Sequence, residues 1–161
     1  MNDINSVNNK QVLKHIKEFV ASRFQMTLAT NGEHPWIATL YYSFDDNLNF
    51  YFLSDPKTLH CRHIAKNPKV AFSIADSPQQ PGSKKQGVQA YGLAHEVSGR
   101  QKIVHALSLW RKTLNVLDEA YTYHGMVTKL IEGRMYKVTP NKIKFFSEVL
   151  WEEGSEPTIE L

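Results

Sequence analysis

The chain is poor in features that would assign it to several large classes of protein. It has one cysteine, Cys61, in 161 residues, which excludes an internal disulfide and a zinc site built from several thiolates and suits a reducing compartment. No apolar run approaches the roughly 18 residues of a membrane-spanning helix. The polar, Asn-rich residues 1–10 lack the apolar core of a secretory signal. The sequence therefore predicts a soluble cytoplasmic protein with no membrane partner.

Short motifs of the common nucleotide-binding and catalytic sites are missing as well. The sequence contains no Walker motif, no GxGxxG fingerprint, no HExxH pair and no pattern typical of a catalytic triad. The longest basic run, Lys84-Lys85, is too short for a nucleic-acid-binding stripe. Aromatic residues in 36–44 and 50–52 offer rings for base stacking, but their strand spacing favours a barrel core. We expect no nucleic-acid partner.

Acidic residues are concentrated at the end of the chain. Residues 152–161 hold four glutamates and no Lys or Arg, so residues 1–151 carry all 19 basic residues but only 12 of the 16 acidic ones, a net charge of +7. A moderately basic body favours small anionic or phosphate-bearing partners.

Length and composition fit one globular domain over residues 1–161. Apolar residues make up 42% and charged residues 22%, close to the globular average, and the length supplies one core rather than two. We expect residues 1–9 to form a flexible start and residues 148–161 an acidic tail.

Apolar residues at spacings of three and four predict three helices. Residues 10–23 and 99–117 show amphipathic patterns, and a shorter helix is predicted over 58–66, between helix-start residues and Asn67-Pro68. Residues 118–132 show no clear pattern.

Alternating, β-branched and aromatic segments predict six or seven short strands. Gly92, inside one of them, predicts a bulge or a close backbone approach, and 140–142 predict a turn between the last two strands. Helices are too few for βαβ units, so we expect a mainly β (α+β) fold, an antiparallel barrel of six or seven strands with two to four flanking helices. The predicted strands are 25–30, 36–44, 48–54, 69–76, 88–97, 134–139 and 143–147.

A candidate anion site lies where the third predicted strand meets the short helix. The start of a helix presents unpaired N–H groups and a partial positive charge. Hydroxyls and basic groups gather around it; they belong to Ser54, Lys57, Thr58, His60 and Arg62. Thr58 and Arg62 share a helix face at i and i+4, so both can approach one phosphate. An ordinary capped helix with a solvated basic face, in which Asp55 is the cap, fits the same residues equally well.

The same segment contains three types of metal ligand that do not form a convincing metal site. One helix cannot easily aim His60, Cys61 and His63 at a single ion, and no second cluster completes a tetrahedral set. We therefore predict no metal, and Cys61 is expected to be a small buried hydrophobe rather than a nucleophile.

The order of these signals resembles the flavin-binding split β-barrels related to pyridoxamine 5′-phosphate oxidase. The resemblance covers residues 10–147 and depends on several degenerate segments that occur in the family's order and spacing. They are PWIATL (35–40), FYFLS (50–54), NPKVAF (67–72), QAYGLA (89–94) and YKVTPNKI (136–143).

The resemblance implies a homodimer with two FMN molecules at the subunit interface. Each flavin would rest against the second and third strands, and its phosphate would meet the short helix. The matching phosphate positions are the five of the anion site, Ser54, Lys57, Thr58, His60 and Arg62. Backbone groups of Ala38, Thr39 and Leu40 would face the isoalloxazine ring, Leu53 would border the flavin on the third strand, and Gln89 matches a polar fifth-strand position near it.

Several positions depart from the vitamin B6 oxidase itself. Ala38 and Tyr42 stand where that enzyme has Arg and Lys, and the Arg and His that grip its substrate near the C-terminus have no counterpart. The resemblance therefore implies an FMN-dependent oxidoreductase that acts on another small molecule, still unknown. The alternatives are a non-catalytic protein that binds or senses flavin or haem, a deazaflavin protein, and an interaction module without a ligand. Flavin chemistry requires no catalytic protein residue, and none is assigned.

Overall fold

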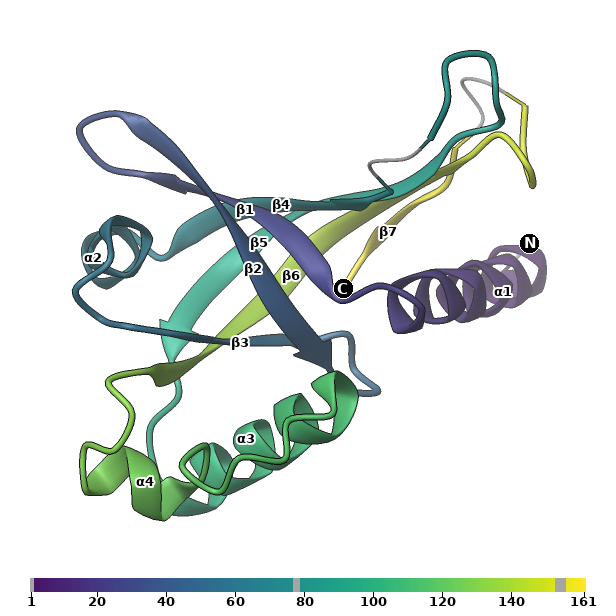
Figure 1. Cartoon of the computed structure of the whole chain (residues 1–161). Helices are drawn as coiled ribbons and strands as arrows, with labels where there is room; N and C mark the ends of the chain where they lie inside the picture. The colour runs from purple at the N-terminus through teal and green to yellow at the C-terminus, as the bar shows by residue number, and fades with distance from the viewer. Residues whose placement is uncertain (1, 77–78, 153–155) are drawn as a thin grey trace.

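Six antiparallel strands close into a barrel, as the sequence predicts. A computed structural model describes residues 2–76, 79–152 and 156–161, with side chains from residue 9 onward. The strands follow the order β3-β2-β1-β4-β5-β6, the pairing of β3 with β6 closes the ring, and β7 adds to β6 (Figure 1). Their bounds are β1 Gln25–Asn31, β2 Pro35–Phe44, β3 Phe50–Ser54, β4 Lys69–Ala75, β5 Gln86–Glu96, β6 Arg134–Ser147 and β7 Thr158–Glu160.

Four helices surround the barrel. α1 (Asn2–Ala21) begins well before Lys10 and so takes in most of the segment that we expected to be a flexible start. α2 (Leu59–Lys66) packs on β1 and β2, and α3 (Arg100–Leu114) lies across β2, β3 and β6. The unassigned segment 118–132 contains the short α4 (Tyr123–Val127), which contacts α3 (Figure 1).

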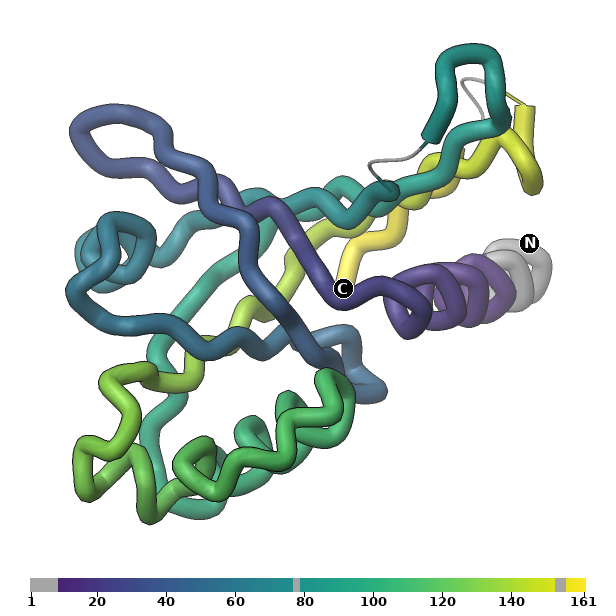
Figure 2. Tube along the Cα trace, viewed as in Figure 1, coloured from purple at the N-terminus to yellow at the C-terminus, as the bar shows by residue number. Residues whose placement is uncertain are grey.

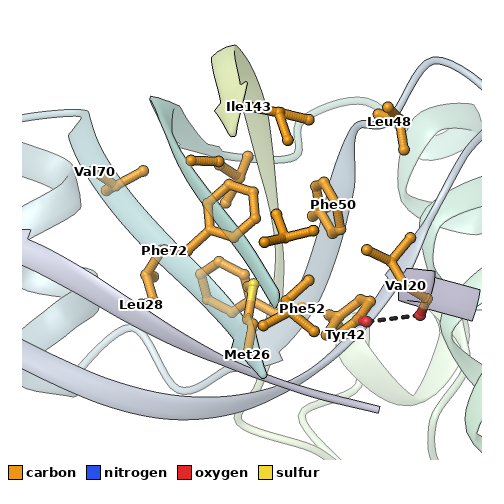
Figure 3. Close-up of a cluster of buried hydrophobic side chains, with 14 of the residues drawn as sticks. Val20, Met26, Leu28, Tyr42, Leu48, Phe50, Phe52, Val70, Phe72 and Ile143 are labelled. Carbon is orange, nitrogen blue, oxygen red and sulfur yellow. Dashed lines mark hydrogen bonds between the residues drawn. The ribbon is translucent and has the colours of Figure 1, made fainter. Parts of the chain in front are cut away.

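Alternation along the strands places one side of each strand in the barrel core. In β1, Met26 and Leu28 are buried and face aromatic residues of the other strands (Figure 3). Phe50 lies at the centre, with its ring 4.8 Å from that of Phe72. The Tyr42 hydroxyl donates to the carbonyl of Val20 at 2.7 Å and so ties the end of α1 to the barrel.

The predicted turn at 140–142 is wrong, because β6 runs unbroken from Arg134 to Ser147. The Cα trace of this segment does not reverse direction (Figure 2). Pro140 pairs with Gly92 and Lys142 with Tyr91, which leaves Asn141 as the extra residue of a bulge. Pro has no N–H to donate to a strand partner, and a bulge is where a sheet tolerates it. The prediction that Gly92 marks a bulge or a close backbone approach is confirmed.

The acidic C-terminal segment contributes a strand to the sheet. β7 pairs with residues 142–144 of β6, beyond the stretch of β6 that pairs with β3. Ile159 on β7 is buried in the main core, and Lys142 and Lys144 form ion pairs with Glu160 and Glu156. Residues 153–155 of the expected tail lie outside the described residues.

The barrel is split between β2 and β3. These strands pair only through residues 42–44 and 50–52, so the edge of β2 over residues 35–41 has no strand partner on the side away from β1 in the described part of the chain. This open edge and the neighbouring α2 form the region where the sequence predicts a ligand.

A second, smaller core lies between the outside of the barrel and α3. It joins Tyr51 of β3 to Leu107 and Trp110 of the helix. The Tyr51 hydroxyl donates to Asp45 at 2.9 Å, and Asp45 also accepts the backbone and side-chain N–H groups of Asn49. Burial raises the pKa of Asp45, but these hydrogen bonds outweigh it and hold the pKa below its ordinary value.

Stability should therefore fall in acid as Asp45 becomes protonated. A carboxylate whose pKa is depressed on folding contributes stability that is complete above its unfolded pKa, about 3.9, and is lost as pH falls through the lower folded pKa. Urea unfolding from pH 6 downward should show that Asp45→Asn costs stability near neutrality and that its difference from the wild type shrinks below about pH 4. A difference that stays constant with pH would contradict this role.

Candidate functional site

A tight turn connects β3 to α2. The Asp55 side chain accepts from the Lys57 amide at 2.8 Å, and its carbonyl accepts from the Thr58 amide at 3.0 Å. Thr58, and not Asp55, is the N-cap residue, and its side chain makes no capping hydrogen bond. The first amides of α2 therefore have no side-chain cap from this residue.

Three predicted site residues converge at this turn. The Nε2 atom of His60 lies 2.8 Å from the Ser54 hydroxyl and 3.2 Å from the Thr58 hydroxyl, and the two hydroxyls are 3.4 Å apart. Ser54 comes from the end of β3, whereas Thr58 and His60 come from the start of α2. The strand and the helix thus bring two hydroxyls and one imidazole together.

The hydrogen bonds constrain what each group can offer to an anion. Thr58 donates its single hydroxyl proton to the carbonyl of Asp55 at 2.7 Å, so toward a ligand it acts only as an acceptor in this arrangement. His60 is 8% exposed, and burial, with a smaller effect of nearby His63, lowers its pKa, which favours the neutral ring at pH 7. Ser54 and His60 are the groups of this cluster that can present a proton to a phosphate.

The two basic residues of the predicted site differ in availability. Lys57 is exposed and bonds to Glu132 at 2.8 Å. Arg62 is exposed on α2, and its side chain has no ion pair or hydrogen bond within the described residues. Side chains in a helix lean toward its N-terminus, so Arg62 starts out in the direction of Thr58, one turn earlier. Of the two, Arg62 is the free cation.

One contact beside this cluster was not predicted from the sequence. His63 on α2 lies against Gly32 in the β1–β2 turn, where an added Cβ would come within 2.3 Å of the ring. Its Nδ1 is also 3.1 Å from the hydroxyl of buried Thr30. Asn31-Gly32 signals a turn in the sequence, but no local pattern indicates which side chain packs against it. The hairpin is thereby fixed on α2.

The predicted flavin-ring positions lie on and near the open edge of β2. Ala38 and Leu40 pair with Leu28 and Met26, so their side chains face the barrel interior. Thr39 is exposed on the opposite face. Leu53 belongs to the partly buried side chains of the second core. The backbone of residues 38–40 lies along the edge of β2 that has no strand partner in the described part of the chain.

Gln89 lies apart from the α2 cluster, on the outer face of the barrel. It is exposed and contributes to a shallow hollow together with Lys142 and Lys144. Strand pairing aligns the outward-facing residues of this face in two rows across the sheet. The middle of each row consists mostly of small side chains. The rows are Thr39, Thr27, Ser73, Gln89 and Lys144, and Ile37, Ala29, Ala71, Tyr91 and Lys142.

The described residues also bear on metal binding, on the single cysteine and on membrane crossing. They contain no group of three or more His, Cys, Asp or Glu side chains placed to hold a metal ion. Cys61 is 2% exposed, as expected of a buried hydrophobe. Among the same residues no helix is long and apolar enough to cross a membrane.

Several known proteins are similar to this chain in sequence or in structure. A UPF0306 protein of Pasteurella multocida is 24% identical over 144 residues, which cover 88% of this chain and 92% of the relative. Campylobacter jejuni ChuZ has a similar structure, with a TM-score of 0.72 and 15% identity over 94% of this chain and 60% of its own. A heme binding protein from Mycobacterium smegmatis gives a TM-score of 0.65 and 15% identity over 88% and 54%.

At such identities the solved structures establish a shared fold and nothing more. The family model described as pyridoxamine 5′-phosphate oxidase matches residues 12–145. This match runs from α1 into β6 and includes β1 to β5 in full and β6 as far as Phe145. The chain therefore belongs to the pyridoxamine 5′-phosphate oxidase family of split β-barrels.

Proposed function

We propose that this protein is an FMN-binding homodimer and acts as a flavin-dependent oxidoreductase on a small molecule other than pyridoxamine phosphate. The observation that carries the proposal is the convergence of Ser54, Thr58 and His60 at the start of α2. A phosphate there would meet the Ser54 hydroxyl, the imidazole and uncapped helix amides, and Arg62 is free to reach it. These are the donors that phosphate monoesters favour in proteins.

The positions of the remaining predicted contacts support the proposed homodimer. Gln89 is on the outer face of β5, whereas the phosphate cluster is at the start of α2, so one subunit does not bring them into one hollow. On the outer face Ile37 is 66% and Tyr91 53% exposed, with Ala29 and Ala71 between them in the same row. A second copy that covers this face would bring its Gln89 toward the first copy's open β2 edge.

The residues present fit the binding of FMN and leave its redox chemistry to the flavin, which when bound supplies the hydride or electron acceptor. The chain would hold the phosphate at α2, orient the ring along residues 38–40, and shield it from water with the partner subunit. Pyridoxamine phosphate is not the expected substrate, because Ala38 and Tyr42 stand where the vitamin B6 oxidase has cationic side chains.

Replacing Arg62 by Gln should weaken FMN binding about tenfold or more, because a hydrogen bond to a charged group contributes about 1.5–3 kcal/mol. Lys66→Gln is the matched control, since Lys66 is an exposed cation in the last turn of the same helix. Quenching of flavin fluorescence measures both dissociation constants. Equal weakening by the two changes would show general electrostatic attraction and contradict the phosphate assignment.

The visible spectrum of the purified protein tests the cofactor itself. After dialysis with excess FMN, the flavin bands should remain at about one flavin per subunit, and NADPH or NADH should bleach them if the protein is an oxidoreductase. Retained flavin without turnover would favour a flavin carrier. A Soret band would favour the haem alternative, which has a precedent in the heme binding protein of the same fold. A colourless protein that retains no FMN would overturn the proposal.

A further inference from the structure

A cleft of about 450 Å³ opens beside α3, on the outside of the barrel. One wall is the start of α3, which contributes Gln101, Lys102 and His105, together with Ser98 just before the helix. The floor is the sheet below. On β3, Tyr51 faces this cleft and the second core, whereas Ser54 bonds to His60 of α2, so the cleft is distinct from the proposed FMN site.

Strand register places three chemically different side chains in one row of that floor. Lys137 of β6 pairs with His95 of β5 on one side and with Tyr51 of β3 on the other. Tyr51 is held by its hydrogen bond to Asp45 and lies edge-to-face with His105, with ring centroids 6.3 Å apart. The floor therefore presents the half-buried Lys137 side chain beside a fixed aromatic ring.

The cleft is lined by more basic than acidic side chains. Lys102 and Lys137 line it, and neither makes an ion pair within the described residues. Glu96 is the carboxylate of this lining and pairs with neither lysine. The first turn of α3 also contains no acidic residue. The two lysines therefore have no carboxylate partner among the described residues, and an anionic ligand would supply a counter-charge to both.

We propose that this cleft binds a small organic molecule that carries a phosphate or carboxylate group on an apolar body. The anionic oxygens would lie between Lys102 and Lys137, with His95 and His105 as further hydrogen-bond donors. The apolar body would rest on the Tyr51 ring and Val97. The volume is within the range of small-molecule sites.

Imidazole signals in ¹H–¹⁵N spectra test the site directly, because histidines mark both candidate pockets. Titration with phenyl phosphate or benzoate at up to about 10 mM, which would reveal a millimolar complex, should shift the His95 and His105 signals. A shift of His60 with phenyl phosphate would report the separate phosphate site at α2. The stronger of the two probes identifies the preferred anionic group. Phenol, which has the ring without the charge, should shift them far less.

Lys102→Gln and Lys137→Gln should each raise the dissociation constant of the better probe about tenfold. Lys112→Gln changes an exposed lysine in the last turn of the same helix and should leave it unchanged. The proposal would be overturned by signals that move at His60 alone, by no movement at either cleft histidine, by phenol binding as well as phenyl phosphate, or by Lys112→Gln weakening binding as much as Lys102→Gln.

Discussion

Replacing Ile37 by Glu should convert the proposed homodimer into monomers and remove FMN binding with it. Ile37 is the most exposed large hydrophobic side chain of the outer face. In a twofold-symmetric dimer the same patch meets its copy, so the variant would bury two carboxylates without partners at several kcal/mol each. The dimer dissociation constant should rise about a thousandfold or more, which sedimentation velocity at micromolar concentration would detect.

Leu117→Glu provides the matched control for this change. Leu117 is 79% exposed in the segment between α3 and α4, away from the outer face, so the same substitution there should leave both the dimer and FMN affinity intact. An Ile37→Glu protein that still dimerises would remove the outer face as the interface. A monomeric variant that still binds FMN would place the complete flavin site within one subunit.

Replacing Gly92 by Ala should destabilise the barrel by about 3 kcal/mol, at the upper end of the usual cost of overpacking. A Cβ at this position would lie 2.1 Å from the Thr139 carbonyl oxygen and 2.7 Å from the Pro140 Cα. Both are backbone atoms of β6 within the pairing to β5, so neither can move without disturbing the ladder. Thermal unfolding should show a midpoint about 10 °C lower.

Gly87→Ala separates this effect from the general cost of a methyl group in the same strand. At Gly87 an added Cβ meets the far end of the Phe146 ring at 2.3 Å and the Ile74 carbonyl oxygen at 3.2 Å. Phe146 is only half-buried and can swing outward, so the loss should be about 1 kcal/mol. Equal losses at the two glycines would show that the bulge has no special intolerance.

The fold was largely predictable because the strands alternate and because glycine and proline mark its irregular points. The error at Pro140 has a physical cause: proline signals a strand end locally, and only the pairing with Gly92 shows that a bulge accommodates it. β7 was missed for a similar reason. It is three residues long, and what identifies it as a strand is the β6 edge beyond the stretch paired with β3.

The candidate phosphate site was predictable in part, because its members are close in the sequence. Ser54, Thr58 and His60 lie within seven positions, so local spacing indicated their convergence. The lowered pKa of His60 was not predictable, since the burial that causes it depends on the packing of the whole helix. The cleft beside α3 gave no sequence signal at all. His95, Lys137 and Tyr51 are neighbours only through strand register.

The pairing that closes the barrel joins segments far apart in the chain. Phe50 of β3 pairs with Val138 of β6, and two strands and three helices lie between them in the chain. Contacts of such long sequence separation lose loop entropy before they gain contact energy, which makes folding slow. Until β3 and β6 meet, both present unpaired edges that another chain can occupy. Changes that weaken this seam should therefore appear first as aggregation during refolding, before any loss of the finished protein's stability is seen.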